Sequence, residues 1–296
     1  MDSGAGVCMI SLPLVVNAGN FEIQLSLFWY HHKKVYGIHA YRKSLAMIVR
    51  RNYLHENKIN DNPWNIGVPY VMTESCFDYL NFEHVDYLPL NTITSLAQVL
   101  CLFDDEEVLE LIDCDQFHMR PHPNFNVQDN EIVCDIIPEE WHLKSKTENK
   151  YMVMPHISLG AFSKQMHSME HLYNGGFVPL IAKVKTFKKM IIDWIQATKK
   201  IFREAKVKEV GYWSSMYGLQ VACANNNIKM RAEECVYIPP FALKDSHYCC
   251  HYAVDKKFDK KNIKTINDID VSKFDDNIFY NGVKEWYHWR KNENAV

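Results

Sequence analysis

The stretch from Asn91 to Asp115 constrains the fold of this chain more than any other. Apolar residues recur on one helical stripe from Asn91 to Phe103, and an acidic turn follows. The continuous apolar run from Val108 to Ile112 is typical of a buried strand, and it ends in two acids, Asp113 and Asp115. A helix, a turn and a buried strand in this order indicate an α/β fold. In such folds ligands collect at the carboxyl ends of the strands.

The two carboxylates at this strand end suggest a cation site. Asp113 and Asp115 are two residues apart on a turning chain, so both can converge on one hard divalent ion, which prefers oxygen ligands. An ion held there could grip a diphosphate. The alternative is an ordinary polar turn after a strand, because short acidic motifs also arise by chance.

Length and hydropathy favour one water-soluble α/β domain. The chain has 296 residues, of which 47% are hydrophobic, and it can bury a large core. No segment approaches the run of ~18 apolar residues that a membrane helix needs. The apolar run from Val7 to Val16 contains Pro13 and has no basic residue before it, which favours a first core strand over a secretory signal. We therefore expect a cytoplasmic protein without a membrane span.

Charge and cysteine content argue against a nucleic-acid-binding protein and against a disulfide-stabilised one. Lys and Arg total 33 against 36 for Asp and Glu, giving a net charge of −3, so the chain has no basic surplus for binding nucleic acid. Nine cysteines, an odd number, lie mostly in apolar stretches and predict buried thiols in a reducing compartment without a disulfide framework.

Three more segments carry helix signals. Asn20 is a candidate cap for a helix through Lys33, which follows the first strand. Apolar residues from Phe187 to Phe202 recur at helical spacing, with lysines mostly on the opposite side. This basic face predicts either a solvated surface or contact with an acidic or phosphate partner. An aromatic cluster near the end, Trp286, Tyr287 and Trp289, is expected to cap the core, with binding of a sugar ring as the alternative.

The residues around the two acids resemble a known family signature. The run from Asp113 to Asn124 resembles the acid-x-Asp and Arg-Pro-x-Pro-Asn signature of the peptidyl hydroxyproline arabinosyltransferases and peptidyl serine galactosyltransferases. Other landmarks fall in the order that these families show. They are Gln24-Leu25-Ser26-Leu27 with Tyr30 and Lys33, Met216-Tyr217-Gly218 with Val221-Ala222, and Ser246-His247-Tyr248-Cys249. The resemblance covers most of the chain in separate pieces.

This resemblance implies a GT-A glycosyltransferase that uses a nucleotide sugar. The implied fold is a single nucleotide-binding domain over residues 1–296, with a mostly parallel central mixed sheet flanked by helices. The donor-binding part would span about residues 1–125, and the acceptor side about 126–296. Carried over by position, Asp113 would face the ribose or the metal, Asp115 would bind the metal, and His247 would be the third ligand, with manganese or magnesium as the ion.

Several residues keep alternative readings. His247 and His251, with Cys249 and Cys250 between them, offer a rival zinc set or a different third ligand. Lys260 resembles the basic residue that steadies the departing diphosphate in such enzymes, although it lies in a lysine run that could simply be solvated. The sequence Asn174-Gly175-Gly176 could let backbone approach a donor sugar, or form a turn.

One departure from the family concerns the acceptor. Ser214-Ser215 stands where these families often place a glutamate immediately before Met-Tyr, so that residue's role does not transfer.

The families also act in the secretory pathway behind a membrane anchor, so a cytoplasmic, microbial or virus-encoded relative would fit this chain. We expect transfer of a sugar from a UDP-sugar to a hydroxyl of a glycan or glycoprotein, with retention. The alternatives are a non-catalytic carbohydrate-binding relative and a metal-dependent nucleotidyltransferase, although no glycine-rich phosphate loop supports the latter.

Overall fold

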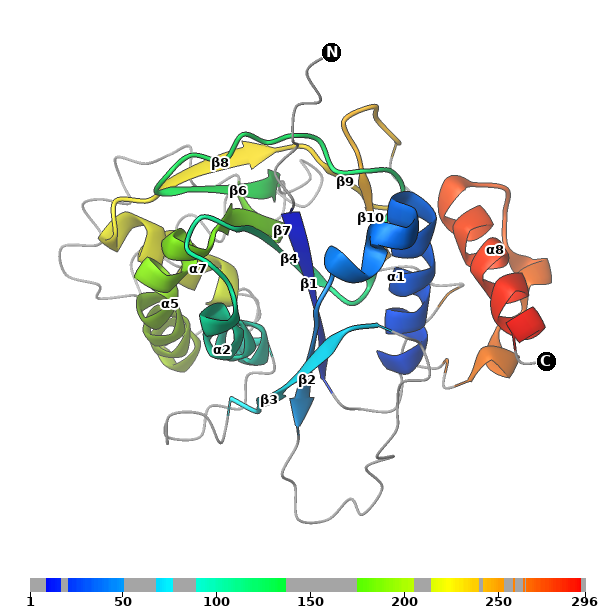
Figure 1. The fold of residues 1–296 in the computed structure, drawn as a ribbon, viewed down its shortest axis with the longest axis horizontal. Helices are drawn as coiled ribbons and strands as arrows, with labels where there is room; N and C mark the ends of the chain where they lie inside the picture. Colours follow the sequence, from blue (N-terminus) through cyan, green and yellow to red (C-terminus); the bar gives the residue numbers. More distant parts are fainter. Residues whose placement is uncertain are drawn as a thin grey trace.

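A seven-stranded mixed sheet with helices on both faces organises the molecule (Figure 1). The computed structural model describes residues 9–16, 21–50, 68–76, 89–136, 175–204, 214–239, 242–252, 258, 263 and 265–293. The strands are β1 (Met9–Val16), β2 (Ala46–Arg50), β3 (Tyr70–Glu74), β4 (Val108–Asp113), β5 (Gln116–His118), β6 (Glu131–Ile136), β7 (Gly175–Lys183), β8 (Lys229–Glu233), β9 (Val236–Tyr237) and β10 (Cys249–His251). The α-helices are α1 (Phe21–Tyr36), α2 (Leu90–Val99), α5 (Val184–Glu204), α7 (Ser214–Asn225) and α8 (Ile278–Glu293). Short 3-10 helices are η1 (Gly37–Arg42), η3 (Leu100–Leu102), η5 (Ile266–Asp268) and η6 (Val271–Lys273).

The large sheet has the strand order β3-β2-β1-β4-β7-β6-β8. Strands β3, β2, β1 and β4 are parallel, β7 runs antiparallel to both β4 and β6, and β8 is parallel to β6. The carboxyl ends of β4 and β6 therefore lie at the same edge of the sheet, where β7 begins. A mixed sheet that is mostly parallel and flanked by helices confirms the predicted fold class.

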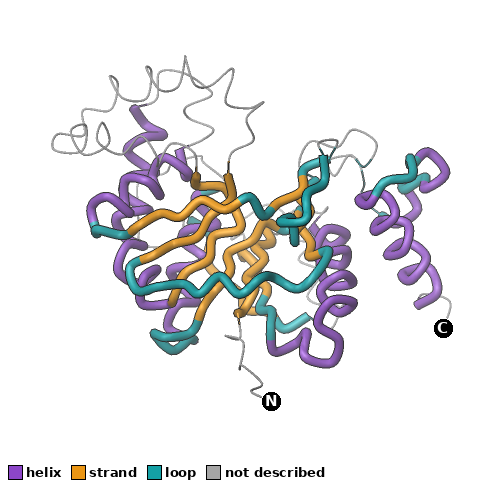
Figure 2. The backbone as a smooth tube through the Cα atoms, turned by 90° about the horizontal axis from the view of Figure 1, so that it is seen from above, coloured by secondary structure: helices purple, strands orange, loops and turns teal. Residues whose placement is uncertain are grey.

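One face of the large sheet packs against α2, α5 and α7. Leu109 and Leu111 of β4 join Ile93 of α2 and Phe187 of α5 in this core, and all four side chains are fully buried. The two residues of β4 point to this face because side chains alternate along a strand. Figures 1 and 2 show these three helices together on one side of the sheet.

The opposite face of the large sheet holds α1 and a second, three-stranded sheet with the order β5-β10-β9. Phe28 of α1 packs there with Ile112 of β4 and Cys249 of β10. Helix α8 lies on the far side of α1, as both views show (Figure 2). Trp286 of α8 is 1% exposed, and its indole Nε1 donates to the hydroxyl of Ser26 in α1 at 3.0 Å.

Most elements expected from the sequence occur at the expected places. The helix predicted from Asn91 ends at Val99 and tightens into the 3-10 helix η3, whose Leu102 is exposed. The helix predicted to end at Lys33 continues to Tyr36. Trp286 is buried in the core, as predicted for the aromatic cluster, and Tyr287 and Trp289 pack against it.

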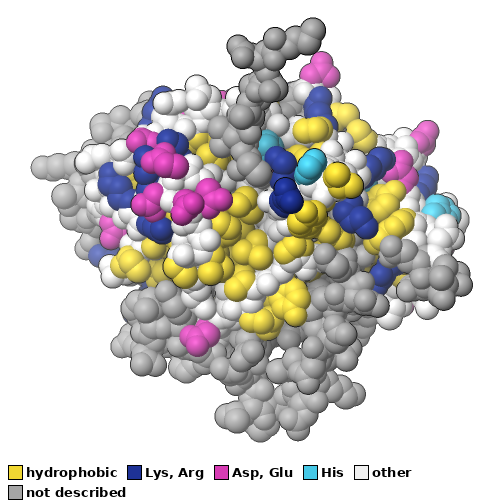
Figure 3. Space-filling model, in the orientation of Figure 1, with side chains coloured by type: hydrophobic (Ala, Val, Ile, Leu, Met, Phe, Trp, Pro, Cys, Tyr) yellow, Lys and Arg dark blue, Asp and Glu magenta, His cyan; other side chains and the backbone are white. Residues whose placement is uncertain are grey.

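The lysines where β7 passes into α5 form ion pairs with acidic side chains. Lys183 and Lys185 each pair with both Glu106 and Asp129, at 2.6–2.9 Å, and Lys188 pairs with Asp105. Figure 3 shows acidic and basic side chains interleaved on the side of the molecule where α5 lies. Of the predicted basic face, Lys188 therefore pairs with an acid of the chain itself, and Lys189 donates to the side-chain oxygen of Asn130. No helix among the described residues has the length and apolarity needed to cross a membrane.

Candidate metal centre

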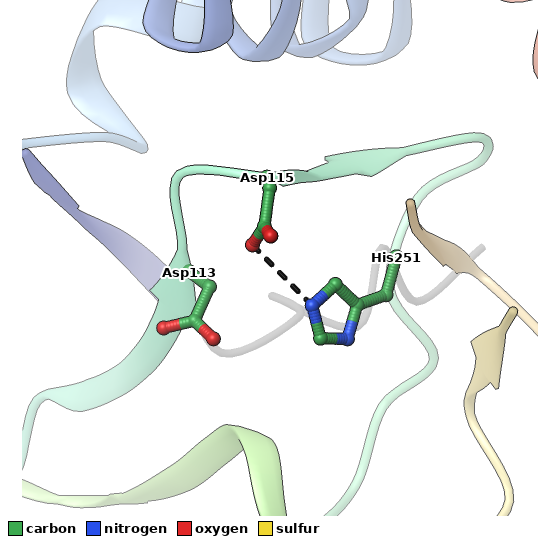
Figure 4. Close-up of side chains that lie close together, drawn as sticks. All are labelled: Asp113, Asp115 and His251. Carbon is green, nitrogen blue, oxygen red and sulfur yellow. Dashed lines mark ion pairs between the residues drawn. The ribbon is translucent and has the colours of Figure 1, made fainter. Parts of the chain in front are cut away.

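Two aspartates and one histidine converge at the carboxyl end of β4. Asp113 is the last residue of β4, Asp115 follows in the turn before β5, and His251 is the last residue of β10. One ligand atom from each residue lies within 4.8 Å of the other two. The Asp115 carboxylate oxygen Oδ1 is 3.3 Å from His251 Nε2 (Figure 4). Asp115 and His251 are buried and Asp113 is half-buried, so the three form a compact pocket of ligand atoms.

Local contacts explain why the chain turns at this point. The side chain of Gln116 accepts a hydrogen bond from the Asp113 backbone N–H at 3.1 Å. Its amide nitrogen donates to the carbonyl of Val178 in β7 at 3.0 Å. The thiol of Cys114 points inward and donates to Gln24 of α1 at 3.0 Å. One glutamine thus closes the turn and fastens it to the neighbouring strand.

The small sheet carries His251 to the aspartates. Strand β10 pairs antiparallel with β5, so His251 stands opposite Gln116, the residue next to Asp115. The backbone N–H of Tyr252 also donates to the carbonyl of Asp115 at 3.2 Å. Residues more than 130 positions apart in the sequence are therefore held side by side by a backbone ladder.

The structure brings His251, and not His247, to the two aspartates. His247 lies in the turn before β10, where its Nδ1 accepts a hydrogen bond from the Lys244 backbone N–H at 3.1 Å. Its Nε2 lies 3.9 Å from the Glu234 carboxylate. Burial lowers the pKa of His247. This histidine is engaged in its own turn, away from the acidic pair.

The rival zinc set does not assemble in the described part of the chain. Cys249 packs against α1 and Ile112, whereas Cys250 packs with Phe117 and Tyr252, because neighbouring side chains on a strand point to opposite faces. Where the structure describes side chains, the metal-ligating group that it contains is Asp113, Asp115 and His251.

The other predicted site residues divide into two groups. Gly175 and Gly176 open β7, and Gly175 pairs with Ile136 at the end of β6, so both glycines lie at the edge of the sheet that carries Asp113. Asn174 and Lys260 lie outside the described residues. The two serines found in place of a glutamate begin α7, where the Ser215 carbonyl accepts from Trp194 at 2.7 Å.

Tyr252 is a neighbour of the site that no sequence motif singles out. Its ring is 1% exposed and stacks on Phe279, and its hydroxyl has no hydrogen-bond partner among the described residues. Burial and then the nearby Asp115 charge raise the pKa of this phenol. A neutral, buried hydroxyl therefore lies close to the acidic pair, available as a donor.

The ligand chemistry fits a hard or borderline divalent cation. Two carboxylates and one imidazole are a common set for manganese or magnesium when phosphate oxygens complete the coordination. The absence of a thiolate from the group argues against a structural zinc site. The residues present therefore suit an ion that also binds a diphosphate.

Comparison with known proteins identifies the family. A model of the hydroxyproline O-arabinosyltransferase family N-terminal domain matches residues 14–232. The chain belongs to the hydroxyproline O-arabinosyltransferase family. It is therefore a glycosyltransferase, as its sequence predicted. The matched range includes Asp113 and Asp115 and ends before His251.

Similar solved structures include two of the galactosyltransferase LgtC. One is a complex with donor and acceptor sugar analogs, at 12% identity and a TM-score of 0.45. The other is an active site mutant, at 11% identity and a TM-score of 0.46. Each covers 83% of this chain and 87% of its own. No curated protein matches this member of the hydroxyproline O-arabinosyltransferase family.

Proposed function

We propose that this protein transfers a sugar from a UDP-sugar to a hydroxyl of a glycan or glycoprotein, with Asp113, Asp115 and His251 holding a manganese or magnesium ion. The observation that carries the proposal is the convergence of these three ligand atoms within 4.8 Å at the end of β4. Family membership supports sugar transfer, and the ligand set supports a bound diphosphate. In this proposal His251 takes the place that the family resemblance implied for His247.

The chain's own residues would divide the work as follows. Asp113 and Asp115 would supply the negative charge that attracts a divalent ion, and His251 would supply an imidazole nitrogen as the third ligand. Gly175 and Gly176 leave room at the same edge for the donor, and Asn174 and Lys260 remain proposed donor contacts. Gln116 keeps the turn closed, because it accepts from Asp113 and donates to Val178.

The proposed reaction breaks the bond between the sugar C1 and the diphosphate oxygen, which keeps the electron pair. The acceptor oxygen forms the new bond to C1, and its proton passes to the departing diphosphate. When bound, the ion supplies positive charge that offsets the charge developing on the diphosphate. We further propose that the anomeric configuration is retained, which NMR of the product anomer tests directly.

The two histidines provide a matched test of the metal site. We expect His251→Ala to weaken Mn²⁺ binding by about 10- to 100-fold in calorimetry, because one of three ligands is lost. His247→Ala removes an equally buried imidazole four residues away and should leave Mn²⁺ binding unchanged. Asp115→Ala should abolish Mn²⁺-dependent UDP binding and donor hydrolysis. Equal effects of the two histidine variants would contradict the assignment of His251.

The donor is identified by a screen. UDP-glucose, UDP-galactose, UDP-xylose and UDP-arabinose should be tested for Mn²⁺-dependent release of UDP. The proposal expects one donor to be hydrolysed far faster than the rest. Glycan binding without UDP release from any donor would instead support a non-catalytic relative.

The location remains a prediction of the same proposal. Most of the cysteines that the structure describes are buried, as small apolar side chains in a reducing compartment would be. This fits a cytoplasmic enzyme, and imaging of the tagged protein would test it. An enzyme found in the lumen of the secretory pathway would contradict this part of the proposal.

A further inference from the structure

A fully buried carboxylate, Glu110, lies on β4 three residues before the candidate metal ligand Asp113. Its side chain is 0% exposed, and it points to the face of the large sheet that holds α1 and the small sheet. An ionised carboxylate in such a place is costly unless hydrogen bonds and charge compensate it. The side chains that compensate the charge of Glu110 therefore show which elements this carboxylate connects.

Three side chains bind this carboxylate. The Ser11 hydroxyl donates to Oε2 at 2.5 Å, the His118 Nε2 lies 2.9 Å from the same oxygen, and the Tyr248 hydroxyl donates to Oε1 at 2.7 Å. Burial alone would raise the pKa of Glu110, but the His118 charge and these hydrogen bonds lower it to about 2. The carboxylate is thus ionised and its hydrogen-bonding capacity is well used.

The three partners come from different sheets. Ser11 pairs with Glu110 itself across β1 and β4, so this bond lies within the large sheet. His118 is the last residue of β5, and Tyr248 immediately precedes β10. Two of the three bonds therefore cross from the large sheet to the small sheet. The small sheet carries His251, whereas β4 carries Asp113.

We propose that Glu110 is a positioning residue for the metal centre: it fastens the small sheet to β4 and so holds His251 at ligand distance from Asp113. The backbone ladder between β5 and β10 already sets His251 against Asp115. Outside that ladder, the His118 and Tyr248 contacts with Glu110 add two bonds between the small sheet and β4. The metal-binding part of this inference rests on the proposed function.

Two substitutions separate positioning from stability. Tyr248→Phe and Ser11→Ala each remove one hydroxyl that donates to the same buried carboxylate, so both should lower the midpoint of urea unfolding. Only Tyr248→Phe cuts a bond between the sheets. We expect Tyr248→Phe to weaken Mn²⁺ binding about tenfold and Ser11→Ala to leave it within twofold of the parent protein.

A crystal structure of each metal-free variant gives a second readout that does not depend on metal binding. In Tyr248→Phe, Asp113 should move away from the Asp115–His251 pair, and in Ser11→Ala the three groups should keep their places. Equal Mn²⁺ affinities with an unmoved Asp113 would overturn the proposal and leave Glu110 a purely structural group. If the parent protein binds no Mn²⁺, the proposed metal site fails, and the position of Asp113 still decides the role of Glu110.

Discussion

At the scale of single residues, the pKa values of two buried carboxylates are shifted in opposite directions by their surroundings. Glu110 is compensated by an imidazole and two hydroxyls, and its pKa is lowered to about 2. Asp135, near the end of β6, is 3% exposed and accepts hydrogen bonds from the backbone N–H groups of Cys235 and Val236, but has no such imidazole. Burial therefore raises the pKa of Asp135 to about 7.

The raised pKa of Asp135 predicts a specific dependence of stability on pH. Since the folded state binds this proton more tightly than the unfolded state, the stabilisation is full below pH ~4 and is lost as the pH rises to about 7. We expect Asp135→Asn, which keeps an acceptor oxygen, to raise the free energy of unfolding at pH 8 by on the order of 1–3 kcal/mol. At pH 4 the same substitution should change the free energy of unfolding little, because Asp135 is then neutral in the folded state. Urea unfolding of both proteins at both pH values measures this. A lower free energy of unfolding for Asp135→Asn at pH 8 would contradict the prediction.

At the scale of elements, the close approach of α5 and α7 depends on one glycine. Gly218 of α7 is buried against Thr198 of α5, and a Cβ at position 218 would lie 2.8 Å from the Thr198 backbone nitrogen. Backbone cannot yield as a flexible side chain can. The sequence places Gly218 in the Met-Tyr helix, but only the packed helices show why the position lacks a side chain.

Substitution at this contact should separate the two helices. We expect Gly218→Ala to lower the free energy of unfolding by about 1–3 kcal/mol, as for other overpacked sites, although alanine favours helix formation. The measurement is urea unfolding. Asn225→Ala, at an exposed position at the end of the same helix, is the control and should stay within about 0.5 kcal/mol of the parent. An unchanged midpoint in Gly218→Ala would mean that the helices can shift apart freely.

At the scale of the whole molecule, the candidate site joins distant parts of the chain and should therefore couple metal binding to global stability. At free Mn²⁺ one hundred times the dissociation constant, binding to the folded state alone would add ~2.7 kcal/mol. For a chain of this size we expect the melting temperature to rise by several degrees, roughly 2–4 °C per kcal/mol. Calorimetric scans with Mn²⁺ and with EDTA measure this difference in melting temperature. Asp115→Ala should show no rise, and a similar rise in that variant would place the ion elsewhere.

Local patterns were enough to predict the helices α1, α2 and α5, the strands β1 and β4, and two of the three residues of the metal group. The apolar run from Val108 and the acids that follow it place Asp113 and Asp115 at a strand end, because a buried strand and its polar terminus are encoded by neighbouring residues. The same holds for α1 and α5, whose apolar stripes are local. The third ligand could not be predicted in this way, because His247 and His251 lie in one short segment and their spacing does not choose between them.

The sequence by itself determined the α/β class, the acidic strand end and, through its signature, the glycosyltransferase family. The tertiary structure decided which histidine meets the acids, because the pairing of β5 with β10 sets His251 opposite Gln116. It also decided which side chains surround Glu110, because its three hydrogen-bond partners come from separate segments of the chain. Contacts between strands more than 100 residues apart depend on how sheets pack, and no local pattern carries that information.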